Sequence, residues 1–209
     1  MGLTSHKSQS IESVIPDRKS CSLIVISTEG KYTEPRYFRS LAPEESHRLK
    51  IIITENKNNE SSPNRVLARL KDHLANNDEF YRDLDYACIV VDVDDHATLD
   101  ATCQEAKDLG YHVLVSNPSF ELWLVLHRTD INGFVTRESL NSMLDDIYRK
   151  SNRQGYDKTK YDLSVLLSGL HQAIKRAEKL DIDKDKIVPR NPCTRVYKVA
   201  QRIIDDLTD

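Results

Sequence analysis

The chain has 209 residues, of which 39% are hydrophobic and 30% are charged, and its formal net charge is −3. This is the composition of a globular protein that can bury a core, and no stretch approaches the roughly 18 consecutive apolar residues of a membrane span. The polar N-terminus also lacks the apolar centre of a signal peptide. Four scattered cysteines, none at zinc-finger spacing, favour a reduced, cytoplasmic protein.

Charge is unevenly distributed along the chain. Residues 1–136 carry 15 basic and 21 acidic side chains, a net charge of −6, whereas residues 137–200 carry 14 basic and 9 acidic side chains, a net charge of +5. An acidic first part could hold a cation while a basic second part contacts a polyanion. A solvated surface of mixed charge explains the same counts.

Strand and helix patterns alternate through the first two-thirds of the chain. Apolar, β-branched runs predict strands at 22–27, 49–55, 86–95 and 111–116. Helical spacing of apolar residues predicts helices between them, at 33–42 with Thr33 as the cap, from Pro63 to Leu74, and at 97–110. Strands that are apolar on both faces and alternate with helices indicate an α/β fold with a mostly parallel sheet flanked by helices.

The last third of the chain is predicted to be helical. A helix is expected from "NPSFELWLVLH", with Asn117 as its cap, and three more are expected at 137–150, 162–180 and 194–207. The expected organisation is therefore a polar N-terminal segment (1–20), an α/β domain (21–135) and a C-terminal helical extension packed on it (136–209).

Acidic side chains follow two of the predicted strands at the point where each strand ends. Asp92 and Asp94 end the third strand, and Glu29 with Gly30 follows the first. Residues two apart in a strand point the same way, so Asp92 and Asp94 should converge, and Glu29 should join them if the two strands are neighbours. Oxygen ligands of this kind suit Mg²⁺ or Mn²⁺, and Gly30 should leave backbone room for a phosphate. The alternative is that each acid is a loop residue or a helix cap.

Four segments carry a wider pattern: "EGKYTEPRYF", "VVDVDD", "SNPSFELWLVLH" and "NPCTRVYKV". Together they resemble the RloB family of bacterial proteins over nearly the whole chain. Glu-Gly after a first strand and Asp-x-Asp after a later one is also the signature of the Toprim fold. The resemblance implies a Toprim-like α/β domain with a helical extension, linked to phage defence. Toprim relatives in such systems act as metal-dependent nucleases, and some cut transfer RNA.

The resemblance also implies roles for individual acids. Glu29 matches the Toprim glutamate, which acts as general acid/base or metal ligand, and Asp92 and Asp94 match the metal-binding pair. Glu121 matches a further catalytic acid near the metal, although an acid in the first turn of a helix also favours the helix dipole. Toprim domains often carry a third acidic position after Asp-x-Asp. Here His96 stands two residues beyond Asp94, so the resemblance does not imply a second metal ion.

Basic side chains supply candidates for contacts with a phosphate. Lys158, in the loop "GYDKTKY", is a candidate catalytic residue, because a nuclease must neutralise the charge that develops on the phosphate. The candidate nucleic-acid contacts are Lys31, Lys160, Arg190, Arg195 and Lys198. Such contacts would make binding fall steeply with salt. The alternative for the lysines is that they are solvated surface residues.

The first hypothesis is a Mg²⁺- or Mn²⁺-dependent endonuclease that cleaves nucleic-acid phosphodiesters in anti-phage defence, with RNA, including transfer RNA, favoured over DNA by family analogy alone. The second is a non-cutting regulatory subunit that binds nucleic acid or nucleotide and works with an ATPase partner of the AAA or ABC type. The third is a phosphotransferase that uses the same metal site. Because the chain lacks a Gly-x-x-x-x-Gly-Lys-Ser/Thr motif, ATP hydrolysis would have to come from the partner. A homo-oligomer is left open.

Overall fold

The computed structural model describes residues 21–43, 46–56, 60–77, 80, 85–94, 96–152 and 154–208. The polar segment predicted for residues 1–20 lies outside the described residues. Within the described part of the chain, no helix combines the length and the apolar character needed to cross a membrane.

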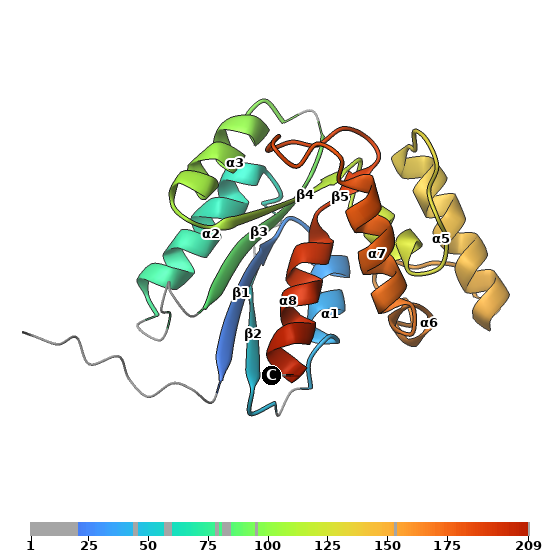
Figure 1. Ribbon diagram of the computed structural model, residues 1–209, viewed down its shortest axis with the longest axis horizontal. Coiled ribbons are helices and arrows are strands. Elements are labelled where there is room, and N and C mark those ends of the chain that lie inside the picture. The colour runs from blue at the N-terminus through green and yellow to red at the C-terminus, as the bar shows by residue number, and fades with distance from the viewer. Residues whose placement is uncertain are drawn as a thin grey trace, which may run out of the picture.

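Five strands form one sheet in the order β2-β1-β3-β4-β5 (Figure 1). The four parallel strands are β1 (Ser22–Thr28), β2 (Leu49–Thr54), β3 (Tyr86–Asp92) and β4 (His112–Asn117). β5 (Cys193–Thr194) is short and runs antiparallel to β4. Every residue of β3 is buried, as expected of a strand covered on both faces. The predicted α/β class with a mostly parallel sheet is confirmed.

Helices cover both faces of the sheet (Figure 1). One face packs against α2 (Pro63–Ala75) and α3 (Leu99–Asp108). The other packs against α1 (Thr33–Arg39), α4 (Glu121–Leu126) and α8 (Val196–Thr208). The remaining helices are α5 (Arg137–Asn152), α6 (Ser164–Leu167) and α7 (Leu170–Leu180). Of these, α5 and α7 pack on α4, so the predicted helical extension is present.

Two predicted helix caps are wrong. Thr33 is the first residue of α1 rather than its cap, and its hydroxyl donates to the carbonyl of Lys158 at 3.4 Å. Asn117 ends β4, and its amide donates to the carbonyl of Pro189 at 2.9 Å. The helix predicted from Asn117 therefore begins later, at Glu121. Both side chains join distant segments, and a local sequence pattern does not show such contacts.

The C-terminal third differs from the prediction in two places. The helix expected at 162–180 is divided into α6 and α7, and Gly169 lies between them. A Cβ atom on Gly169 would lie 2.0 Å from the carbonyl oxygen of His127, so the close approach of the two backbones requires glycine there. β5 was not predicted, because two residues are too short to show an alternating pattern.

Candidate functional site

The ends of β1 and β3 bring two predicted acids together. These strands are parallel neighbours, and the N–H of Glu29 donates to the carbonyl of Val90 at 3.1 Å. The Glu29 carboxylate in turn accepts the backbone N–H of Asp92 at 3.1 Å between nitrogen and Oε2. The expectation that Glu29 meets the end of the third strand is therefore met, at the carboxyl edge of the sheet where α/β proteins bind ligands.

A third acid, Glu34, joins this edge and was not predicted. It lies in the first turn of α1 with 7% of its surface exposed, and its Oε1 accepts the N–H of Gly30 at 3.0 Å. A Cβ atom on Gly30 would lie 1.9 Å from the Glu34 carboxylate, so the space beside this glycine is filled by a side chain of the same chain. Gly30 nevertheless lines the cavity that these acids share, so room for a phosphate at its backbone stays a prediction. The one sequence signal for Glu34 was its place in the first turn of the predicted helix, which does not show that its carboxylate turns back on Gly30.

The acids line one cavity of about 240 Å³. Four carboxylates face it, those of Glu29, Glu34, Asp92 and Glu121. Its cationic side chains are Lys31, Arg137 and Lys158. We call this space the carboxylate cavity. Four acids against three cations leave it with an excess of negative charge.

Burial disfavours the charged forms of these acids. It raises the pKa of Glu34 to about 7, with smaller contributions from the negative charges of Glu121 and Glu29. The pKa of Asp92 is raised well above its ordinary value, first by burial and then by Glu34 and Glu29. Burial also raises the pKa of Glu29. The cavity therefore has a strong tendency to take up protons or cations.

Glu121 differs from its neighbours because it already has partners. Ser119 donates to its Oε2 at 2.6 Å, and Lys158 Nζ lies 2.6 Å from its Oε1. Burial alone would raise the pKa of Glu121, but the hydrogen bonds from Lys158 and Ser119 outweigh burial and lower it. Glu121 is thus a charged acid paired with the predicted catalytic lysine.

The loop that carries Lys158 is attached to α1. Besides the contact between Thr33 and the Lys158 carbonyl, Arg36 donates to the carbonyl of Thr159 at 3.0 Å. Tyr161 donates its hydroxyl to the carbonyl of Thr33 at 2.8 Å. These contacts hold Lys158 at the cavity, whereas Lys160 is exposed and does not line it.

Asp94 belongs to a group of potential metal ligands that does not include Asp92. Ligand atoms of Glu29, Asp94 and His96 lie within 4.8 Å of one another, and Asp92 is not part of this group. The N–H of His96 donates to Asp94 Oδ1 at 3.2 Å. β3 ends at Asp92, so the alternation expected to align Asp92 with Asp94 does not extend to Asp94. His96, which departs from the Toprim pattern, offers a ring nitrogen in its place.

Arg137 was not predicted and comes from the first residue of α5. Its Nη2 lies 3.8 Å from Asp92 Oδ2 and donates to the carbonyl of Val93 at 3.3 Å. No local pattern links residue 137 to β3, because the contact depends on how α5 packs. Lys31 lies at the rim, with its Nζ 5.7 Å from the centre of the Tyr32 ring.

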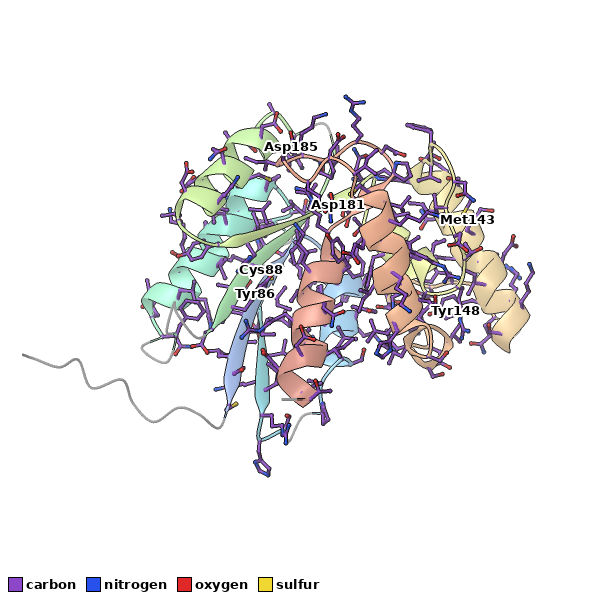
Figure 2. All side chains as sticks on the ribbon, in the orientation of Figure 1. Tyr86, Cys88, Met143, Tyr148, Asp181 and Asp185 are labelled. Atoms are coloured by element: carbon purple, nitrogen blue, oxygen red, sulfur yellow. The ribbon has the colours of Figure 1, made fainter. Side chains whose placement is uncertain are left out.

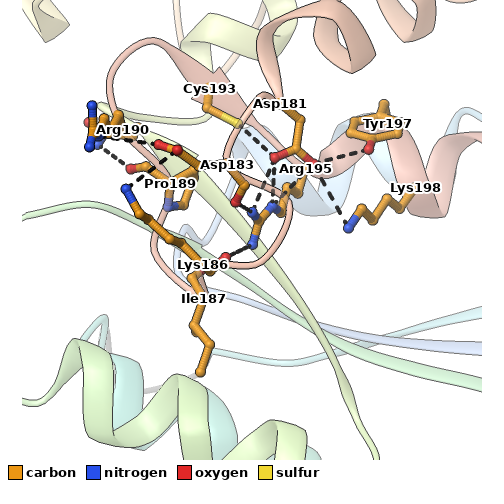
Figure 3. A network of polar contacts seen from close by, with 11 residues as sticks. Asp181, Asp183, Lys186, Ile187, Pro189, Arg190, Cys193, Arg195, Tyr197 and Lys198 are labelled. Carbon is orange, nitrogen blue, oxygen red and sulfur yellow. Dashed lines mark hydrogen bonds and ion pairs between the residues drawn. The ribbon is translucent and has the colours of Figure 1, made fainter.

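The remaining predicted nucleic-acid contacts, Arg190, Arg195 and Lys198, do not line the carboxylate cavity. They lie together in a polar network that includes Asp181 and Asp183 (Figure 3). Arg195 is 5% exposed, and all five of its N–H groups have acceptors. These acceptors are the Asp181 carboxylate and the carbonyls of Asp183, Lys186 and Ile187. Arg195 is therefore a structural residue, and its assignment as a phosphate contact is corrected because no donor remains.

Arg190 and Lys198 surround the same network. Arg190 Nε lies 3.4 Å from Asp183 Oδ2, and Lys198 Nζ lies 3.9 Å from Asp181 Oδ2. Arg190 is largely exposed, with 76% of its side-chain surface accessible. The proposed contact of these two residues with nucleic acid stays a prediction.

The comparison with protein families decides the relationship suggested by the sequence motifs. A family model described as RloB-like protein matches residues 24–203. The chain belongs to the RloB family. Within this RloB family member, the match spans all of the described site residues, from Glu29 to Lys158. Curated proteins and solved structures gave no significant match to the chain.

Proposed function

We propose that this RloB family member is a metal-dependent endonuclease that cleaves nucleic-acid phosphodiesters. The observation that carries the proposal is the carboxylate cavity, in which Glu29 contacts the end of β3 and four acids face three cations. Phosphodiester hydrolysis needs ligands for a divalent metal and cations that balance the phosphate, and this edge of the sheet supplies both kinds of group.

The donor set suits a divalent metal of the hard type. Carboxylate oxygens are the ligands that Mg²⁺ and Mn²⁺ prefer. Burial raises the pKa values of Glu29 and Asp92, so a bound cation would favour their charged forms. Glu29 would hold the metal either with Asp94 and His96 or with Asp92, the two groups into which the predicted ligands fall. When bound, the metal would polarise the scissile phosphate and lower the pKa of a water molecule.

The other side chains of the cavity have roles that follow from their charge. Lys158 can move from Glu121 to a phosphate oxygen, because its side chain is 56% exposed and its backbone is held by α1. Glu34, with a pKa of about 7, can hold or release a proton near neutral pH. RNA as the substrate, and a role in anti-phage defence, are proposed from family analogy.

A second candidate is a non-cutting regulatory subunit that binds nucleic acid or nucleotide beside an ATPase. One feature favours it: Glu121 is already paired with Lys158, and Asp92 lies near Arg137. If these pairs persist in the working protein, the cavity has less need of a metal. The two candidates differ in whether divalent cations bind here and in whether any strand is cut.

The test is to incubate the purified protein with total RNA and with plasmid DNA, with and without Mg²⁺ or Mn²⁺. We expect metal-dependent cleavage that is lost in Glu29→Gln and in Asp92→Asn. The matched control is Glu178→Gln, which removes an exposed acid of α7 and should cut normally. Cleavage that survives both cavity substitutions would overturn the assignment, and binding without cleavage would favour the regulatory subunit.

A further inference from the structure

A second cavity, of about 200 Å³, lies on the outer side of β4. Its walls are the end of α3, the first residues of β4, the segment 184–187 and the start of α8. Figure 2 places Asp185, in the segment between α7 and β5, beside α3. This cavity shares no lining residue with the carboxylate cavity. We call it the lysine cavity.

The lysine cavity exists because β5 is too short to cover its neighbour. β5 pairs with Ser116 and Asn117, so His112 to Leu114 have no strand on their outer side. The N–H of Arg195 donates to the carbonyl of Val115 at 3.0 Å, which shows that the Val115 backbone faces outward. Backbone direction alternates along a strand, so the peptide groups of Val113 face the same open edge.

The charge of this cavity is opposite to that of the whole chain. Its cationic lining residues are Lys107, Lys184, Lys186, Arg195 and Lys198. One lining carboxylate, that of Asp185, opposes these five cations, and Asp181 and Asp183 pair with Arg195 and Lys186, so the local balance is 5 − 3 = +2. The chain as a whole carries −3.

Two of the lysines have no acid of their own. In the described part of the chain, no carboxylate lies within ion-pair distance of Lys107 or Lys184, although both line the cavity. Lys186 and Lys198 share Asp183 and Asp181 with the two arginines described above. The lysines without a carboxylate partner thus lie on two walls, Lys107 at the end of α3 and Lys184 in the segment 184–187.

Neighbouring groups respond to this excess of positive charge. Burial lowers the pKa of Lys198, and the positive charges of Arg195 and Lys184 lower it further. Burial likewise lowers the pKa of His112, with contributions from Arg202 and Lys198. Burial is the first cause of both shifts, neighbouring cations add to it, and Asp181 opposes the shift of Lys198.

We propose that the lysine cavity binds a phosphate group, carried either by a small phosphorylated molecule or by a nucleic-acid chain. A phosphate monoester carries nearly two negative charges and three acceptor oxygens, which suits several lysines that each offer three donors. A carboxylate would neutralise one cation and leave the rest unbalanced. The start of α8 adds the positive end of a helix dipole at the same place. This proposal does not depend on the proposed nuclease.

The test uses inorganic pyrophosphate as the probe, in a buffer of low salt with a chelator so that no divalent metal contributes. Isothermal titration should show binding to the wild type. It should weaken at least about tenfold in the double substitution Lys107→Ala and Lys184→Ala, because two charge-assisted contacts are lost. The control is Lys150→Ala with Lys175→Ala, which removes two exposed lysines of α5 and α7 and should leave binding unchanged.

Backbone amide signals provide a second measurement. Pyrophosphate should shift the signals of Val113 and Ile187 and leave that of Gly30 unchanged. The proposal is overturned if millimolar pyrophosphate does not bind, if the two double variants lose affinity equally, or if the shifts occur at Gly30 instead. A competing unphosphorylated oligoribonucleotide separates the sources: displacement of pyrophosphate assigns the site to nucleic-acid phosphates, and no displacement assigns it to a small molecule.

Discussion

Two places in this protein bury carboxylates, and they do so in opposite ways. Asp181 is 1% exposed and accepts from Arg195, Tyr197 and Cys193. Burial alone would raise its pKa, but the hydrogen bond and charge of Arg195 outweigh burial and lower it. In the carboxylate cavity, Glu34 accepts one backbone N–H and Asp92 has Arg137 at 3.8 Å, and these partners do not outweigh burial, so both pKa values rise. A buried acid with many donors stabilises a fold, whereas buried acids with too few donors provide a place for a proton or a metal.

The largest effect on stability should come from breaking the hydrogen-bond network between Asp181 and Arg195. We expect Asp181→Ala to lower the free energy of unfolding by about 3–5 kcal/mol, because it leaves the buried Arg195 guanidinium without its carboxylate. Urea unfolding followed by circular dichroism measures this loss. Glu178→Ala, at an exposed position on the preceding helix, should change little. If the two variants were equally stable, Asp181 would not stabilise the fold, and its contrast with the acids of the carboxylate cavity would be lost.

The next effect concerns the buried acid Glu34. Its pKa of about 7 in the folded protein exceeds the ordinary glutamate value of 4.5, so the folded state binds more protons than the unfolded state between these values. Stability attributable to Glu34 is therefore present below about pH 4.5 and is lost as the pH rises through about 7. Glu34→Gln should remove this loss and stabilise the protein at pH 8 by on the order of 2–3 kcal/mol.

Unfolding temperatures of both proteins across this pH range measure the difference. The glutamine oxygen can still accept the N–H of Gly30, so the substitution changes the charge while the hydrogen bond is kept. A wild-type protein whose stability relative to Glu34→Gln is constant from pH 5 to pH 8 would contradict the raised pKa.

A smaller effect is expected from metal binding. Mg²⁺ or Mn²⁺ at about a hundred times its dissociation constant should stabilise the folded protein by about 2.7 kcal/mol. Thermal unfolding should show the shift in the wild type and not in Glu29→Gln, since Glu29 belongs to both acidic groups. Asp94→Asn and Asp92→Asn then separate the two groups. If the metal-induced shift persists in Asp94→Asn, the metal does not use the group that contains His96.

The smallest effect on stability should come from Lys158→Ala. Its ion pair with Glu121 is half exposed on the lysine side, so the free energy of unfolding should fall by about 1 kcal/mol or less. Under the proposed function, the same substitution should abolish cleavage while binding of the nucleic acid persists. A change in stability as large as that of Asp181→Ala would instead make Lys158 a structural residue.

Local sequence patterns predicted the features that depend on neighbouring residues. The strands and most of the helices follow from apolar periodicity, and the meeting of Glu29 with Asp92 follows from placing two strand ends at one edge. Glu34 was missed although it is close in sequence, because nothing local shows that its helix turns back on Gly30.

Long-range packing explains the other errors. Arg137 reaches Asp92 through the packing of α5, and Arg195 was interpreted as a surface cation because the burial of Asp181 is not visible in the sequence. β5 depends on a segment that returns to β4 after a long excursion through helices. The sequence shows that a side chain is charged, but it shows neither how exposed that side chain is nor which groups pair with it. Burial and pairing are what distinguish the structural Arg195 from the candidate site residues.

The attachment of the Lys158 loop to α1 has a consequence for how the protein is made. Translation proceeds from the N-terminus, so the ribosome releases Glu29, Glu34, Asp92 and Glu121 before it has added either Arg137 or Lys158. The nascent chain therefore carries the acids without these two counter-charges. Closure of the cavity must wait until residues 158–161 have been synthesised and can dock on a helix made more than a hundred codons earlier.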